Sequence, residues 1–279
     1  MGIEKQVLHL IPSQPSQDGD GVKIQRVAGP MLNTWMDPYL MLDEIRSDDA
    51  TDYIGGFPPH PHRGFETITY MIDGKMRHRD HMGNEGLIVS GGVQWMTAAR
   101  GVIHSEMPEQ EEGLLHGFQL WLNLPADEKL KPSAYRDIQT EEIPELTNTK
   151  GAKLRVIAGD IELDGQHAVG PIAGLTTEPV ILDLQLEPDA QMSLTLPTSH
   201  NTLVYVFEGD LKEVPHRQMG VFGEGDELQL SAENAPARAL VLAGAALREP
   251  IVQHGPFVMN SVEQIHQAIN DYQNGVLTD

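Results

Sequence analysis

The chain has no cysteine, which excludes disulfide bridges, thiolate metal sites and a cysteine nucleophile. Basic residues are also scarce: 19 Lys and Arg stand against 41 Asp and Glu, so the formal net charge is −22. A surface this acidic repels nucleic acid phosphates and anionic membranes. We therefore expect no direct binding to nucleic acid, whereas a basic partner protein is compatible with the charge.

Long apolar runs are missing as well. No stretch is long enough to cross a membrane. Residues 1–14 (MGIEKQVLHLIPSQ) lack the basic start and the apolar centre of a signal peptide. Together with the missing cysteines, these absences lead us to expect a cytoplasmic protein without membrane attachment.

Short segments typical of β-strands fill the first half of the chain. Residues 65–73 (FETITYMID) are rich in aromatic and β-branched side chains and end at Gly74, a turn signal. Further segments of this kind follow, separated by glycines: residues 75–80, 87–90, 93–98 and 117–124. Short strands at this spacing indicate a closed barrel or a jelly roll.

The second half repeats the pattern between residues 153 and 243, so the sequence predicts an all-β fold of two tandem barrels. The stretch between them is rich in proline and charge and is interpreted as a connector. The predicted domains are therefore 1–130, 131–152 and 153–279. A capping box at Ser261–Gln264, followed by apolar residues at helical spacing, predicts a short C-terminal helix.

Two residue pairs with i, i+2 spacing stand out: His60 with His62, and His104 with Glu106. Residues two apart on a strand point to the same face, so two neighbouring strands could bring these four side chains together. We predict a mononuclear metal site. The carboxylate ligand is left open, because Glu66 lies four residues after His62 and would face the same way on a straight strand.

The other histidines carry a weaker signal. His78, His81 and His116 have no such partner in this interpretation and are expected to be ordinary core or surface residues. His200 stands alone in the second half, which has no His-x-His pair, so no metal is expected there. The predicted site is therefore single and belongs to the first barrel.

Imidazole and carboxylate ligands suit Fe(II), Mn, Zn, Ni or Cu(II). A shell of three histidines and one carboxylate leaves coordination positions open for a substrate oxygen and O₂, as in non-haem iron oxygenases. Four side chains are candidates for lining a pocket beside the ion, with core packing as the alternative for each: Phe57, Trp95, Met96 and Phe118.

These stretches resemble a known family. The run from Gly55 through His60, His62 and Glu66 is similar to the first cupin motif, and Gly101-x-x-His104 is similar to the core of the second. Four longer stretches resemble the pirin family specifically: HPHRGFET, QWMTAARGVIHSEM, HGFQLWLNL and REPIVQHGPFVMN. The resemblance runs through most of the chain, although the spacing after the first cupin glutamate is one residue longer than the general motif.

The resemblance implies a bicupin, with two cupin jelly-roll barrels. It implies one Fe held by His60, His62, His104 and Glu106, and leaves Glu66 outside the ligand set. It also implies quercetin 2,3-dioxygenase activity and, for the mammalian branch of the family, iron-dependent transcriptional co-regulation in the nucleus.

We therefore expect an Fe(II)-dependent dioxygenase that cleaves flavonols such as quercetin with O₂. Glu106 would take the proton of the flavonol 3-hydroxyl as a catalytic base. The alternative function is a non-enzymatic iron- or redox-sensing protein that acts through a regulatory protein partner. Fold alone does not decide between these two classes.

Overall fold

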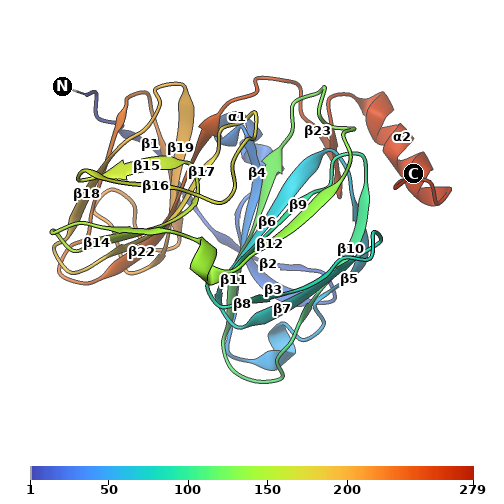
Figure 1. The fold of residues 1–279 in the computed structure, drawn as a ribbon, viewed down its shortest axis with the longest axis horizontal. Helices are drawn as coiled ribbons and strands as arrows, with labels where there is room; N and C mark the ends of the chain where they lie inside the picture. Colours follow the sequence, from blue (N-terminus) through green and yellow to red (C-terminus); the bar gives the residue numbers. More distant parts are fainter. Residues whose placement is uncertain (1) are drawn as a thin grey trace. The chain divides into compact units, whose positions relative to one another are not determined.

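The computed structural model describes residues 2–279, which group into two compact units (Figure 1). The first barrel contains residues 14–33, 39–140 and 247–279. The second barrel contains residues 2–13, 34–38 and 141–246. This grouping differs from the chain-order division at 1–130, 131–152 and 153–279, because each end of the chain packs with the barrel that is farther away in sequence.

The first barrel is built from two antiparallel sheets, with strand orders β12-β9-β6-β11-β4-β3-β2 and β5-β10-β7-β8. The strands of the larger sheet are β2 (Gln14–Asp18), β3 (Val22–Ala28), β4 (Tyr39–Ser47), β6 (Phe65–Asp73), β9 (Val93–Thr97), β11 (Leu115–Asn123) and β12 (Ala134–Ile138). Those of the smaller sheet are β5 (Phe57–His62), β7 (Lys75–Asp80), β8 (Glu85–Val89) and β10 (Val102–Pro108).

Strand β6 occupies the middle of the larger sheet, between β9 and β11. Its aromatic and β-branched side chains suit a pleated surface that is covered on both faces, and residues Phe65 to Met71 are all buried. Side chains alternate between the two faces of a strand, so Thr69 shares a face with Phe65, whereas Glu66 points to the opposite face.

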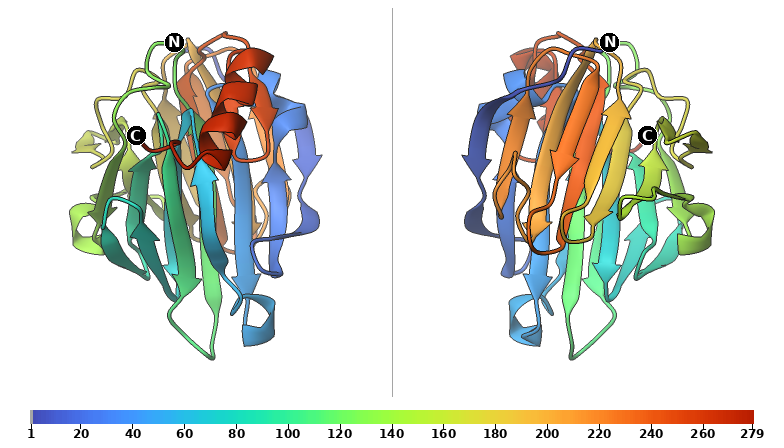
Figure 2. Two further views of the ribbon diagram at one scale, coloured as in Figure 1. Left: turned by 90° about the vertical axis from the view of Figure 1, so that its right-hand side faces the viewer. Right: turned by 90° about the vertical axis from the view of Figure 1, so that its left-hand side faces the viewer.

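The second barrel repeats the all-β architecture. Its seven-stranded sheet has the order β1-β20-β19-β22-β17-β14-β13, and its strands lie side by side in the right-hand view of Figure 2. These strands are β1 (Val7–Pro12), β13 (Glu145–Thr147), β14 (Ala152–Ala158), β17 (Val180–Leu186), β19 (His200–Glu208), β20 (Gln218–Phe222) and β22 (Ala237–Ala245). Two two-stranded antiparallel sheets complete it: β15 (Asp160–Leu163) with β16 (Gln166–Val169), and β18 (Gln191–Thr195) with β21 (Glu227–Ser231). Its interior is a continuous cluster of Leu, Val, Ile and Ala side chains.

The C-terminal segment forms β23 (Val252–His254), β24 (Phe257–Met259) and helix α2 (Val262–Gln273). Ser261 caps α2 in a capping box with Gln264, which confirms the predicted helix start. Buried Ile265 and Ala268 of α2 pack in one cluster with Phe257 of β24. The remaining helical turns are short: η1 (Pro30–Leu32), α1 (Asn33–Met36), η2 (Ala50–Asp52) and η3 (Thr140–Glu142). No helix within residues 2–279 is long and apolar enough to span a membrane.

The predicted connector, residues 131–152, contributes a strand to each barrel. Strand β12 pairs with β9 in the first barrel, and β13 pairs with β14 in the second. Both lie at the ends of their sheets, where short strands rich in polar residues are common. Their composition therefore resembles that of a loop, although their backbones are hydrogen-bonded into sheets.

Candidate metal site

The three predicted histidine ligands lie on two paired strands of the smaller sheet. His60 and His62 belong to β5, and His104 belongs to β10, directly opposite His60. Strand β5 reads FPPHPH and tolerates three prolines because it is the edge strand of its sheet, where missing N–H groups break few ladder hydrogen bonds. The i, i+2 spacing and the antiparallel register together bring the three rings to one place.

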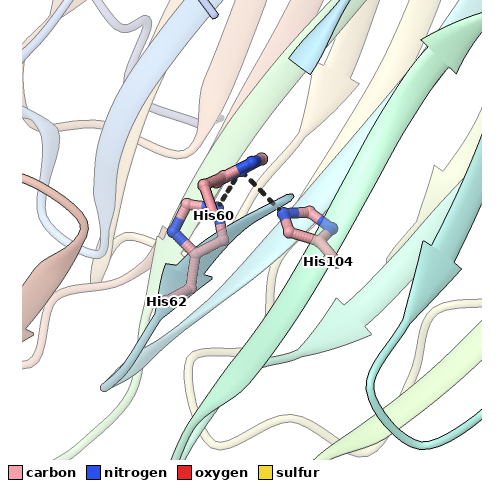
Figure 3. A group of neighbouring side chains, drawn as sticks. All are labelled: His60, His62 and His104. Atoms are coloured by element: carbon pink, nitrogen blue, oxygen red, sulfur yellow. Dashed lines mark hydrogen bonds between the residues drawn. The ribbon is translucent and has the colours of Figure 1, made fainter. Parts of the chain in front are cut away.

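The ring nitrogens face one another, as Figure 3 shows. The Nε2 atom of His60 lies 3.0 Å from Nε2 of His62 and 2.9 Å from Nε2 of His104. With metal–nitrogen bonds of about 2.1 Å, two ligands at right angles about one ion are about 3.0 Å apart, and two tetrahedral ligands about 3.4 Å. The spacing therefore fits adjacent ligands of a single ion.

Protonation favours metal binding as well. The Nδ1 atom of His60 lies 2.8 Å from the carbonyl oxygen of Pro58, which can only accept, so in the neutral ring the proton is on Nδ1 and Nε2 presents a lone pair. Burial holds the pKa values of His62 and His104 well below their usual range, and the neighbouring imidazoles lower them further. Both rings are therefore uncharged and have a lone pair available for a metal ion.

Glu106 is buried next to this cluster and is held by two donors. Thr69 Oγ1 donates to its Oε1 at 2.9 Å, and Gln119 Nε2 donates to its Oε2 at 2.7 Å. The strand register shifts between His104 and Glu106, so the carboxylate is not among the atoms that gather within 4.8 Å of one another. The structure thus brings together three of the four predicted ligands, and the fourth stays a prediction.

On a straight strand Glu66 would face the same way as His62. This expectation is wrong, because the chain turns between β5 and β6. Gly64 makes this turn with φ +94°, and a Cβ there would lie 1.9 Å from the carbonyl oxygen of Val258. Glu66 accepts a hydrogen bond from Thr97 Oγ1 at 2.7 Å, on the face of β6 opposite to Thr69. Burial raises the pKa of Glu66. The geometry therefore favours Glu106 over Glu66 as the fourth ligand.

A cavity of about 750 Å³ in the first barrel opens onto His60 and His62. Aromatic rings form part of its wall: Trp121 stacks on Phe65 with ring centroids 4.2 Å apart and meets His62 edge-on at 5.3 Å. The residues that line the cavity are Asp18, Gly19, Asp20, Arg26, Pro30, Met41, Phe57, Pro58, His60, His62, Gln119, Trp121, Gln253, Gly255 and Pro256. The lining combines apolar side chains with a few polar and charged groups, and this mixture suits a small molecule.

Of the four predicted lining residues, the cavity uses only Phe57. Phe118 is buried and lies on the other face of β11, because Gln119 and Trp121 alternate with it. The alternation in GFQLWLNL could have identified Gln119 and Trp121 as a pair on one face. Arg26 carries no comparable local signal.

Arg26 of the cavity wall is paired with two carboxylates. Arg26 donates to both oxygens of Asp43, at 3.0 Å and 2.7 Å, and to Asp18 at 3.1 Å. Its positive charge is therefore balanced by two carboxylates. An anionic ligand would gain little from this arginine, so the cavity suits a neutral molecule better.

Two antiparallel barrels, one of which holds a cluster of three histidines beside a cavity, are the features of a bicupin. The chain belongs to the pirin family: a family model described as Pirin matches residues 21–122, and one described as Pirin C-terminal cupin domain matches residues 181–278. These matches confirm the expected family and the all-β bicupin fold.

Relatives of similar length support this assignment. A Pseudomonas aeruginosa protein is 51% identical over 98% of both chains, and a Vibrio cholerae protein is 46% identical over 99% of this chain and 98% of its own; each is named "Putative quercetin 2,3-dioxygenase". A crystal structure of quercetin 2,3-dioxygenase from Acinetobacter baumannii superposes with a TM-score of 0.90 at 33% identity, covering 99% of both chains.

Proposed function

We propose that this protein is an Fe(II)-dependent dioxygenase that cleaves a flavonol such as quercetin with O₂. The observation that carries the proposal is the convergence of three Nε2 atoms beside a cavity of about 750 Å³. The names of the similar proteins support the same substrate class. The cavity volume lies within the range of small-molecule sites in proteins, about 300–1,000 Å³.

The residues present fit a metal ion. His60, His62 and His104 would hold it, with Glu106 as the fourth ligand. Imidazole and carboxylate ligands without a thiolate suit Fe(II), with Mn, Ni, Zn and Cu(II) as alternatives. When bound, the ion would act as a Lewis acid and as a redox partner for O₂.

In this proposal Glu106 acts as the catalytic base. Each of its oxygens accepts one hydrogen bond, from Thr69 or from Gln119, so the carboxylate is fixed in orientation and retains lone pairs for a further proton. Gln119 also lines the cavity and so connects the carboxylate with the space where substrate binds. In this proposal, the hydroxyl of a flavonol bound in this space would give its proton to Glu106.

The walls of the cavity account for a flat aromatic substrate. Trp121 and Phe57 offer rings, and Met41 and Pro58 add apolar surface. Aromatic rings pack well against such side chains in offset or edge-on arrangements. Because Arg26 is neutralised by its carboxylate partners, the binding of a neutral polyphenol is favoured over that of an acid.

Glu106→Gln tests this proposal, with Glu66→Gln as the matched control because Glu66 is also a buried glutamate that accepts from a threonine. Fe(II)-loaded proteins are mixed with quercetin, and the loss of flavonol absorbance and of O₂ is followed. We expect Glu106→Gln to be slower by about 10²–10⁴-fold, the usual contribution of a general base, and Glu66→Gln to keep its rate. Iron-loaded wild-type protein that consumes neither flavonol nor O₂ would refute the activity, and a full rate in Glu106→Gln would refute the role of Glu106.

A further inference from the structure

A fourth buried histidine lies behind the predicted ligands, on the side of His104 away from His60. The Nδ1 atom of His78, on β7, is hydrogen-bonded to Nδ1 of His104 at 3.4 Å. In the register of β10 with β7, His104 is opposite Asp80 and Glu106 is opposite His78. His78 and Asp80 therefore form a third i, i+2 pair, directly beside the pair on β10.

Asp80 completes this arrangement. Its Oδ2 lies 3.7 Å from Nε2 of His78, and both side chains are fully buried. The backbone N–H groups of Met82 and Asn84 donate to Asp80 Oδ1, and the side-chain amide of Asn84 donates to Oδ2. The carboxylate is thus fixed by three donors of the following turn, and it acts on His78 through its field, since 3.7 Å exceeds hydrogen-bond length.

These contacts permit two arrangements of the ring protons of His78 and His104. Only one of them allows His104 to bind metal. If His104 carries its proton on Nδ1, it donates to His78 Nδ1, and the proton of His78 is on Nε2, facing Asp80. If His78 donates instead, the proton of neutral His104 is on Nε2, where a metal ion would have to bind. The carboxylate of Asp80 attracts the proton of His78 toward Nε2 and so favours the first arrangement.

We propose that His78 and Asp80 are positioning residues that hold His104 in its metal-binding tautomer. The proposal rests on the metal site proposed above and adds a function for two residues that are not ligands themselves. Groups of this kind orient metal-binding histidines in proteins, and their loss typically weakens metal binding by about 10–100-fold.

The surroundings fix the ring of His78 in place. Tyr135 stacks on it with ring centroids 4.6 Å apart and an interplanar angle of 26°. The Tyr135 hydroxyl donates to Asp137 at 2.6 Å and accepts from the amide of Gln94 at 3.0 Å. Gly86 of β8 is opposite His78 of β7, and a Cβ at Gly86 would lie 2.0 Å from the Tyr135 hydroxyl. Glycine at this position therefore leaves room for Tyr135.

Two substitutions at position 78 separate hydrogen bonding from packing. In His78→Asn, the amide oxygen takes the place of Nδ1 and can still accept from His104 Nδ1, whereas His78→Leu fills similar space without an acceptor. Tyr135→Phe is the control, because it keeps the ring stacked on His78 and removes only the hydroxyl. Thermal unfolding of each metal-free variant reports whether the fold is retained.

The dissociation constant for Fe(II), measured without oxygen by competition with a chelator, is the first readout. We expect His78→Leu to bind about 10–100-fold more weakly than wild type. His78→Asn and Tyr135→Phe should stay close to wild type. Wild-type affinity in His78→Leu overturns the proposal, and so does an equal loss in His78→Asn and His78→Leu at unchanged melting temperature.

NMR signals of the histidine ring nitrogens in metal-free wild type are the second readout. The His104 signals are identified by their loss in His104→Ala. We expect a proton on Nδ1 of His104 and none on Nε2. A proton on Nε2 and none on Nδ1 overturns the proposal, even if His78→Leu does not fold. If wild type binds no Fe(II), the proposed function fails, whereas this spectrum still decides the tautomer.

Discussion

Replacing His60 by alanine should separate metal binding from folding. The Nε2 atom of His60 faces those of His62 and His104 at 3.0 Å and 2.9 Å. The Pro58 carbonyl fixes the proton of neutral His60 on Nδ1, so lone pairs oppose one another in this cluster. His60 is also only partly buried. We therefore expect His60→Ala to leave the metal-free stability unchanged or slightly increased.

The effect on the metal-bound protein should be large. An ion present at 100 times its dissociation constant adds about 2.7 kcal/mol to the free energy of unfolding. For a unit of about 150 residues, each kcal/mol raises the melting temperature by about 2–4 °C, so wild type should gain about 5–11 °C. If the loss of one ligand weakens binding about 100-fold, the same metal concentration adds only about 0.4 kcal/mol, or about 1–2 °C.

The assay is thermal unfolding of the first barrel with and without Fe(II), together with the measured metal content. His254→Ala is the control, because His254 is an exposed histidine of the same barrel outside the cluster. If His60→Ala kept the full metal-induced rise in melting temperature, or its full metal content, the assignment of His60 as a ligand would be refuted. If the free energy of unfolding of the metal-free variant fell by several kcal/mol, the ring of His60 would instead be needed for packing.

Two further predictions concern buried charges outside the cavity. Burial raises the pKa of Glu66, so its contribution to stability is present below its ordinary pKa of 4.5 and is lost as pH rises through the raised value. The side chain at this position stays neutral in the variant Glu66→Gln, so the variant should gain stability relative to wild type on going from acid to neutral pH. Denaturant unfolding at both pH values measures this, and the same difference in free energy of unfolding between variant and wild type at both would contradict it. Buried Lys129 donates to the carbonyl oxygens of Gly64 and Val258 and to Asn123 Oδ1. Lys129→Met should cost about 1–3 kcal/mol for each acceptor left unpaired, and unchanged denaturant unfolding would count against it.

The sequence allowed the three histidines to be predicted because strand alternation is a local rule. The i, i+2 spacing puts His60 and His62 on one face without any knowledge of the rest of the chain. The antiparallel pairing of β5 with β10 then had only to place His104 opposite His60. Their convergence is confirmed by the nitrogen–nitrogen distances.

The carboxylate could not be chosen in this way. A spacing of four residues suggested that Glu66 shares a face with His62, but this holds only within one strand. The turn at Gly64 separates the two residues into β5 and β6. Its tight contact with Val258, almost 200 residues later, is not visible in the local sequence. The pairing of β1 with β20 depends on partners just as distant.

His78 also follows the local rule of strand alternation. It was expected to be an ordinary histidine, yet with Asp80 it has the same i, i+2 spacing as the two pairs that were recognised. Alternation shows that such a pair shares a face, but it does not show what that face contacts. The strand order β5-β10-β7 decides this, because it places the third pair behind His104 rather than beside the cavity. Three pairs of one spacing thus have different positions: two present groups toward the predicted ion, and the third determines where a proton lies.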